Sequence, residues 1–170
     1  MKILIVSKFE EADYLCDMVT SQLLTSSDFE LSFTNSPSFL FDNYPSIPSL
    51  YGRGYSIYGK IPSTTKVNIV DINSLLASDF RIFDFVIYPS IRRDSSRFDD
   101  AVNVLGSSNV ISIDGEDDFL ISHKALSSVY FKRELISCFT FLGVLPISFF
   151  IPILYFIHRR ISHKKTDCGF

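Results

Sequence analysis

The chain has 170 residues, which is enough for one ordinary domain or for half of a two-domain protein. Apolar residues make up 46 % of it and charged residues 21 %, which excludes an intrinsically disordered chain. A net charge of −3 and a pI near 5.5 argue against a nucleic-acid-binding protein, because such proteins usually carry a basic excess.

The charge is unevenly distributed along the chain. Residues 1–134 carry a net charge of −6, residues 135–170 carry +3, and no side chain is charged between Leu135 and Ile157. Three widely spaced cysteines without a C-x-x-C pair indicate neither a zinc ribbon nor a redox motif. The apolar start is interrupted too early by charges to be a signal peptide, so a cytoplasmic location is expected.

The first elements follow a β-α-β pattern. Lys2–Ser7 is a short apolar run that predicts a buried strand, Glu10–Thr25 has apolar residues at helical spacing, and Phe29–Thr34 alternates like a second strand. We expect the two strands to pair in parallel. Residues 36–62 then form a long aromatic-rich excursion with four prolines and three glycines, and such long loops are usually functional.

The second half continues the alternation of strands and helices. Its predicted elements are a short strand at Val67–Val70, a short helix at Asp71–Ser78 with Asp71 as N-cap, a strand at Phe83–Tyr88, a helix at Ser95–Leu105 that ends at Gly106, and strands at Asn109–Ile113 and Ser128–Phe131. This order predicts an α/β fold, namely a Rossmann-like open parallel sheet with helices on both faces.

Acidic side chains follow one of the predicted central strands. Asp114, Glu116 and Asp117 come directly after Asn109–Ile113, and ligands of such sheets bind beyond the carboxyl ends of the strands. Carboxylates in this position accept hydrogen bonds from hydroxyl groups, bind a cation or act as a general base. The alternative is a solvated turn without a ligand.

Cationic side chains lie at further strand ends and in the excursion. Arg92 follows Phe83–Tyr88 and is a candidate substrate contact; the alternative is a solvent-exposed strand end. Lys132 and Arg133 follow the last predicted strand and suit a phosphate or a carboxylate; the alternative is a local ion-pair network. Arg53 and Tyr55, in a glycine-rich segment, could present a sugar or anion contact, or belong to a structured turn. The spacing of histidines and cysteines matches no standard metal site.

The uncharged run at 135–157 permits two interpretations. Its 23 residues are enough to span a bilayer, and the basic residues after it would suit the cytoplasmic side, which predicts a membrane-anchored binding module. However, Pro146 and Pro152 would interrupt a helix, and Ile147–Ile151 between them suits a strand equally well.

Five motifs occur in an order that resembles a group of bacterial and phage glycosyltransferase-like proteins. They are YGRGY (51–55), FDFVIY (83–88), IDGED (113–117), YFKREL (130–135) and PISFFIP (146–152). The resemblance implies the acceptor-side N-terminal domain of a two-domain GT-B enzyme. In that interpretation residues 1–152 form the Rossmann-like domain, with PISFFIP as its last strand, and residues 153–170 form a basic tail or a truncated interdomain segment.

The resemblance also implies roles for the candidate residues. Asp114, Glu116 and Asp117 are the candidate base or acceptor contacts, and Arg53, Lys132 and Arg133 are candidate anion contacts. The expected partner is a sugar or glycan acceptor. No metal is expected, because the resemblance implies that positive side chains or helix ends stabilise the leaving diphosphate. No cofactor is expected on this chain either, because the nucleotide-sugar donor of GT-B enzymes belongs mainly to the second domain, so the chain is expected to be inactive alone.

Overall fold

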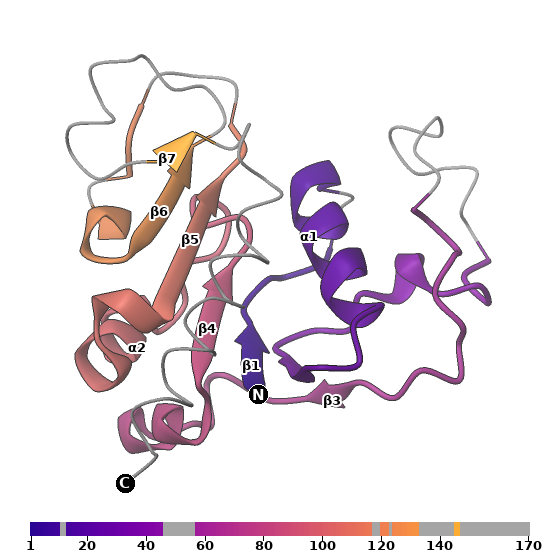
Figure 1. Ribbon diagram of the computed structural model, residues 1–170, viewed down its shortest axis with the longest axis horizontal. Helices are drawn as coiled ribbons and strands as arrows, with labels where there is room; N and C mark the ends of the chain where they lie inside the picture. Colours follow the sequence, from indigo (N-terminus) through magenta and orange to yellow (C-terminus); the bar gives the residue numbers. More distant parts are fainter. Residues whose placement is uncertain (11–12, 46–56, 117–119, 123, 133–144, 147–170) are drawn as a thin grey trace, which may run out of the picture.

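The computed structural model describes residues 1–10, 13–45, 57–116, 120–122, 124–132 and 145–146. Their framework is a seven-stranded sheet, parallel throughout, in the order β3-β2-β1-β4-β5-β6-β7 (Figure 1). The strands are β1 (Lys2–Ile5), β2 (Glu30–Phe33), β3 (Asn68–Ile69), β4 (Phe85–Tyr88), β5 (Val110–Asp114), β6 (Val129–Lys132) and β7 (Leu145–Pro146). The α-helices are α1 (Tyr14–Leu24) and α2 (Phe98–Leu105), and the 3-10 helices are η1 (Ser38–Leu40), η3 (Ala77–Ile82), η4 (Ser107–Asn109) and η5 (Lys124–Ser127).

Helices cover both faces of the sheet, as the sequence predicts. Successive side chains of a strand point to opposite faces, so Ile3 and Ile5 of β1 pack in one core with α1, while Leu4 packs in a second core with α2. β4 is buried along its whole length, which explains its continuous apolar sequence. The α/β class and the Rossmann-like parallel sheet are therefore confirmed.

The first helix begins later than predicted. Helix α1 starts at Tyr14 rather than Glu10, because the Asp13 carboxylate accepts a hydrogen bond from the Cys16 backbone N–H at 3.2 Å and so caps the helix. Ahead of it Phe9 has φ 50°, in the left-handed region that only a few non-glycine residues occupy. The loop between β1 and α1 is thus longer than the sequence pattern indicates.

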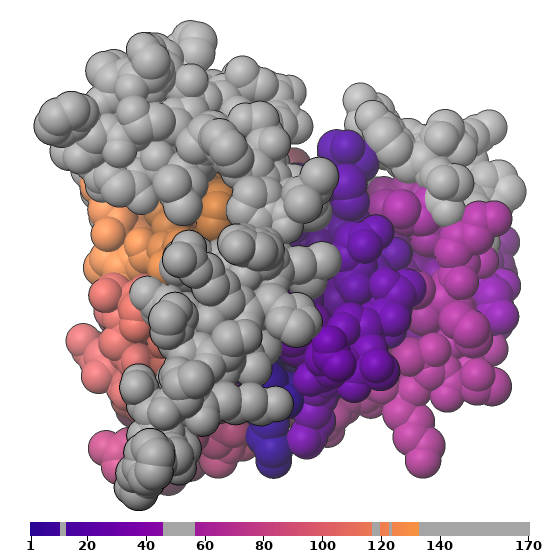
Figure 2. Space-filling model, viewed as in Figure 1, coloured from indigo at the N-terminus to yellow at the C-terminus, as the bar shows by residue number. Residues whose placement is uncertain are grey.

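The aromatic-rich excursion after β2 folds back onto the α1 face of the sheet. Phe41 and Ile61 form an isolated parallel bridge, and the ring of Phe39 packs edge-on against Tyr44 and Tyr58. Figure 2 shows the violet surface of α1 in contact with the magenta surface of this excursion. The described part of the predicted loop therefore extends the hydrophobic core.

The predicted helix at Asp71–Ser78 is wrong. The Asp71 carboxylate accepts a hydrogen bond from the Asn73 backbone N–H at 3.0 Å, and this local turn is followed by the 3-10 helix η3. Short polar side chains that bond to nearby backbone groups compete with helix formation, and three of them lie within four residues here.

The apolar run at 135–157 is described at two residues only, Leu145 and Pro146, which form β7 beside β6. The predicted strand Ile147–Ile151, the domain end at 152 and the tail 153–170 lie outside the described residues. Among the residues that are described, no helix has the length and apolar character needed to cross a membrane.

Candidate functional site at the carboxyl edge of the sheet

The strand order creates a switch point between β1 and β4. The chain leaves β1 toward one face of the sheet, where α1 lies, and it leaves β4 toward the other face, where α2 lies. The loops that follow these two strands therefore diverge, and a crevice forms between them. A pocket of about 250 Å³ occupies this place, which we call the switch-point pocket.

The switch-point pocket combines hydroxyl groups with charges of both signs. Its lining residues are Ser7, Lys8, Phe9 and Glu10 after β1, Asp13 at the start of α1, and Ser90 and Arg93 after β4. The loop after β1 is anchored from behind, because Ser7 and Thr34 exchange two hydrogen bonds of 3.0 Å. The strained backbone of Phe9 is held in this loop, and strain of this kind concentrates at functional sites.

Arg93 joins three elements around the pocket. Its Nη1 lies 3.4 Å from Oδ2 of Asp13, and its Nε donates to Oε1 of Glu116 at 3.0 Å. The guanidinium is half exposed, so these ion pairs contribute little to stability. Their effect is to hold two carboxylates, one from α1 and one from the loop after β5, on either side of one cation.

A buried network beneath Glu116 fixes the loop after β5. The side chains of Asp114 and Lys132 are both fully buried, with Nζ 3.1 Å from Oδ1. Tyr130 donates its hydroxyl proton to the other carboxylate oxygen at 2.6 Å, and the Glu116 backbone N–H donates to Oδ1 at 3.1 Å. Lys132 also donates to the Glu116 carbonyl at 2.9 Å. We call Asp114, Tyr130 and Lys132 the buried triad.

The register of the sheet explains how the buried triad assembles. Asp114 pairs with Lys132 across β5 and β6, and Ser112 pairs with Tyr130 two residues earlier. Because alternate residues of a strand share a face, Tyr130 and Lys132 point to the same side. Burial and the hydrogen bond to Asp114 raise the pKa of Tyr130, so its hydroxyl stays a donor.

Four of the eight predicted site residues lie among the described residues. Asp114, Glu116 and Lys132 come together as predicted from the strand ends, and Arg92 Nη1 lies 4.0 Å from Asp114 Oδ2. The other four, Asp117, Arg53, Tyr55 and Arg133, lie outside the described residues.

Three residues on which the site depends, Asp13, Arg93 and Tyr130, were not among the predicted site residues. The predicted helix Glu10–Thr25 places Asp13 in its first turn, as an acidic residue that complements the helix dipole, whereas in the structure Asp13 is the N-cap. Tyr130 lies two residues before Lys132 in the same strand, and this spacing places both side chains on one face.

A second buried carboxylate belongs to α1 itself and lies on its buried face. Asp17 is fully buried and accepts the hydroxyl proton of Tyr58 at 2.8 Å and the Asp13 backbone N–H at 3.1 Å. Burial raises its pKa to about 7. The neighbouring Cys16 thiol is buried as well, and burial raises its pKa, which argues against a nucleophilic role.

The described residues contain no group of three or more His, Cys, Asp and Glu side chains that could hold a metal ion. No protein-family model, curated protein or solved structure matches this chain. The glycosyltransferase resemblance therefore rests on the five motifs, and the function must be argued from the site itself.

Proposed function

We propose that the chain is the acceptor-binding domain of a glycosyltransferase-like protein and that the switch-point pocket binds hydroxyl groups of the acceptor sugar. The observation that carries the proposal is the position of Arg93 between the carboxylates of Asp13 and Glu116 at this pocket. A sugar hydroxyl both donates and accepts hydrogen bonds, so it suits a site in which carboxylate acceptors and a guanidinium donor lie side by side.

The two carboxylates differ in what they offer a ligand. Asp13 is mostly buried, with 17 % of its side chain exposed, and its other oxygen caps α1, which suits a fixed hydrogen-bond acceptor. Glu116 has 36 % of its side chain exposed and lies just after β5, so among the predicted acidic residues it suits the base that would take a proton from an acceptor hydroxyl.

Asp114 takes a positioning role in this proposal. Its side chain is fully buried and both oxygens are bonded within the buried triad, to Tyr130 and to Lys132. Lys132 is equally buried, so it fixes the loop of Glu116 instead of contacting an anion. The nucleotide-sugar donor would be supplied on a second domain, as the family resemblance implies.

Binding of simple sugars to the full chain tests the proposal. We expect methyl glycosides of glucose, galactose, mannose and N-acetylglucosamine, titrated at millimolar concentrations, to include at least one that shifts the amide NMR signals of residues 7–9 and 90–93. Arg93→Ala should weaken that binding roughly ten- to a hundredfold, because a hydrogen bond from a charged donor is worth about 1.5–3 kcal/mol.

Arg81→Ala is the matched control, since Arg81 is an exposed arginine in η3 that does not line the pocket. Asp13→Asn adds a second variant, because asparagine keeps the helix cap and removes only the charge. Sugars that leave residues 7–9 and 90–93 unshifted, or affinities that are equal for Arg93→Ala and Arg81→Ala, would contradict the proposal.

A further inference from the structure

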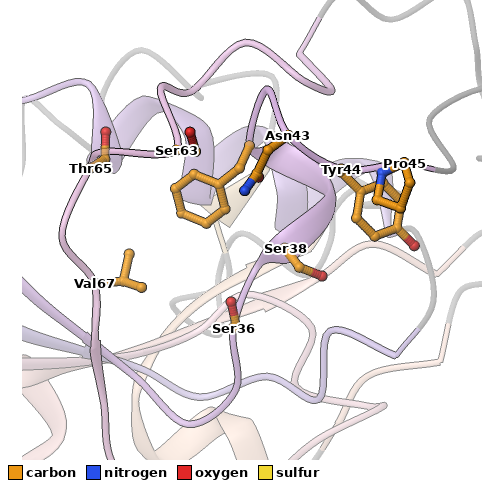
Figure 3. A pocket seen from close by; sticks show the side chains of 9 residues that line it. Ser36, Ser38, Asn43, Tyr44, Pro45, Ser63, Thr65 and Val67 are labelled. Atoms are coloured by element: carbon orange, nitrogen blue, oxygen red, sulfur yellow. The ribbon is translucent and has the colours of Figure 1, made fainter.

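The structure has a second pocket of about 360 Å³. One side of it is formed by η1 and the residues around it, and the other side by the segment that precedes β3. Figure 3 shows Ser63 and Thr65 on one side of it, Ser36 and Ser38 on the opposite side, and Tyr44 at its end. We call it the hydroxyl pocket. Neither the candidate residues of the sequence nor the proposed function makes use of it.

The hydroxyl pocket has a mixed lining of polar side chains and of Phe41, Tyr44, Pro45 and Val67, and none of its lining residues is charged. Within the part of the chain that the structure describes, the side chains of Ser36, Ser38, Asn43, Ser63 and Thr65 make no hydrogen bond to protein atoms. Their donors and acceptors are thus free to bond to a ligand. Two less exposed hydroxyls, by contrast, are bonded within the protein: that of Thr34 to Ser7 and that of Ser128 to Ser112.

The surroundings of this pocket favour a neutral ligand over an anion. Oδ1 of Asp42 accepts the Ser63 backbone N–H at 2.9 Å, which fixes one wall to the other and leaves a negative charge beside the pocket. Tyr44 is held in place by its edge-on contact with Phe39, at 6.1 Å between ring centroids. A fixed aromatic ring among free hydroxyl and amide groups suits a carbohydrate, which has apolar C–H faces and a polar edge.

The two pockets are neighbours in the fold. Asn35 Nδ2 donates to the carbonyl oxygen of Ser7 at 3.0 Å, which joins the loop of the switch-point pocket to the residue preceding Ser36. The ring of Phe39 lies between Phe9 of the switch-point pocket, at 6.4 Å, and Tyr44 of the hydroxyl pocket. A ligand longer than one sugar unit could therefore reach both.

We infer that the hydroxyl pocket is a subsite for a second, neutral sugar residue of the acceptor, so that the acceptor is an oligosaccharide. The inference rests on the proposed function in one respect, namely that the bound sugar is a glycosyl acceptor. The affinity of the pocket for a neutral sugar follows from its own lining and is measured separately.

A comparison of neutral trisaccharides with their monosaccharides tests the inference on the full chain. The probes are trisaccharides of glucose, galactose, mannose and N-acetylglucosamine, with trigalacturonate as the charged comparison. We expect at least one neutral trisaccharide to shift the amide NMR signals of residues 63–67 and to bind roughly tenfold more tightly than the matching monosaccharide. Trigalacturonate should bind these residues more weakly.

Thr65→Val removes one hydroxyl at nearly constant volume, and we expect it to weaken trisaccharide binding about fivefold, since a neutral hydrogen bond is worth about 1 kcal/mol. Thr64→Val is the matched control, because Thr64 is exposed and does not line the pocket. Shifts confined to residues 7–9 and 90–93 would overturn this inference and leave the proposed function standing. Shifts confined to residues 63–67 would uphold the sugar site and count against the proposed function.

An absence of shifts at residues 63–67 with every neutral trisaccharide also overturns the inference. So does equal binding by Thr65→Val and Thr64→Val, or stronger binding of trigalacturonate at these residues.

Discussion

Asp17 is the residue whose ionisation opposes folding. It lies fully buried on the inner face of α1, with Tyr58 and Asp13 as its hydrogen-bond partners, the Cys16 thiol beside it and Arg93 as the cation that acts on it. Burial raises its pKa from 3.8 to about 7, so the folded state keeps a proton that the unfolded chain releases. Between pH 4 and pH 7 the folded state binds more protons, and stability from this group must fall as the pH rises.

Asp17→Asn should abolish this loss, because a neutral amide does not titrate. We expect the free energy of unfolding of Asp17→Asn, relative to the unsubstituted chain, to rise by roughly 2–4 kcal/mol between pH 4 and pH 7, measured by urea denaturation. Asp99→Asn is the control, since Asp99 is exposed and pairs only with Lys124 in the described structure. A difference that stays constant with pH would show that Asp17 is already ionised in the folded state.

The pairing of β5 with β6 depends on the buried triad. Replacing Asp114 by Asn leaves the ammonium group of Lys132 buried without its carboxylate, and breaking a buried ion pair from one side costs about 3–5 kcal/mol. We therefore expect Asp114→Asn to lower the free energy of unfolding by about that amount in urea denaturation. Combining it with Lys132→Met should restore most of the loss, because the buried charge is then gone.

The double variant is the informative control for these two strands. If Asp114→Asn and Asp114→Asn with Lys132→Met were equally unstable, the cost would lie in the lost hydrogen bonds of Tyr130 and Glu116, and the ion pair would not be the main contribution.

The elements were predictable to different degrees, for physical reasons. The buried strands β1, β4 and β5 can be recognised in the sequence as continuous apolar runs, because a parallel sheet is covered on both faces. The start of α1 depends on one hydrogen bond that the Asp13 side chain accepts, and the turn at Asp71 depends on one that the Asp71 side chain accepts. Single hydrogen bonds of this kind leave no periodic pattern in the sequence.

The candidate site was predictable as a location but only partly as an arrangement. Asp114, Glu116 and Lys132 each follow or end a strand, so their shared edge was visible in the sequence. The direct contact between Asp114 and Lys132 depends on the register of β5 and β6. This register cannot be read from a single sequence. The hydroxyl pocket was not predicted, because its two walls meet only when the excursion folds back.

At the scale of the whole molecule, the sheet is stable at its centre and weak at one edge. β1, β4 and β5 lie in the middle and are buried, whereas β3 is a two-residue edge strand with both residues exposed. Amide hydrogen exchange reports such differences. We expect the amides of β1, β4 and β5 to exchange slowest and that of Ile69 to exchange at least a hundredfold faster. Equal protection of Ile69 and Ile87 would contradict this view of the sheet.

The position of β1 between β2 and β4 has a consequence for how the chain folds. β2 follows β1 after one helix, so this pair closes a short loop, whereas the Lys2 backbone N–H bonds to the Asp84 carboxylate 82 residues further along the chain. Closing the larger loop costs more chain entropy, and this cost arises before the contacts between β1 and β4 can stabilise the pair. The two walls of the switch-point pocket are the loops after β1 and β4, so the pocket forms only when this longer-range pairing is complete.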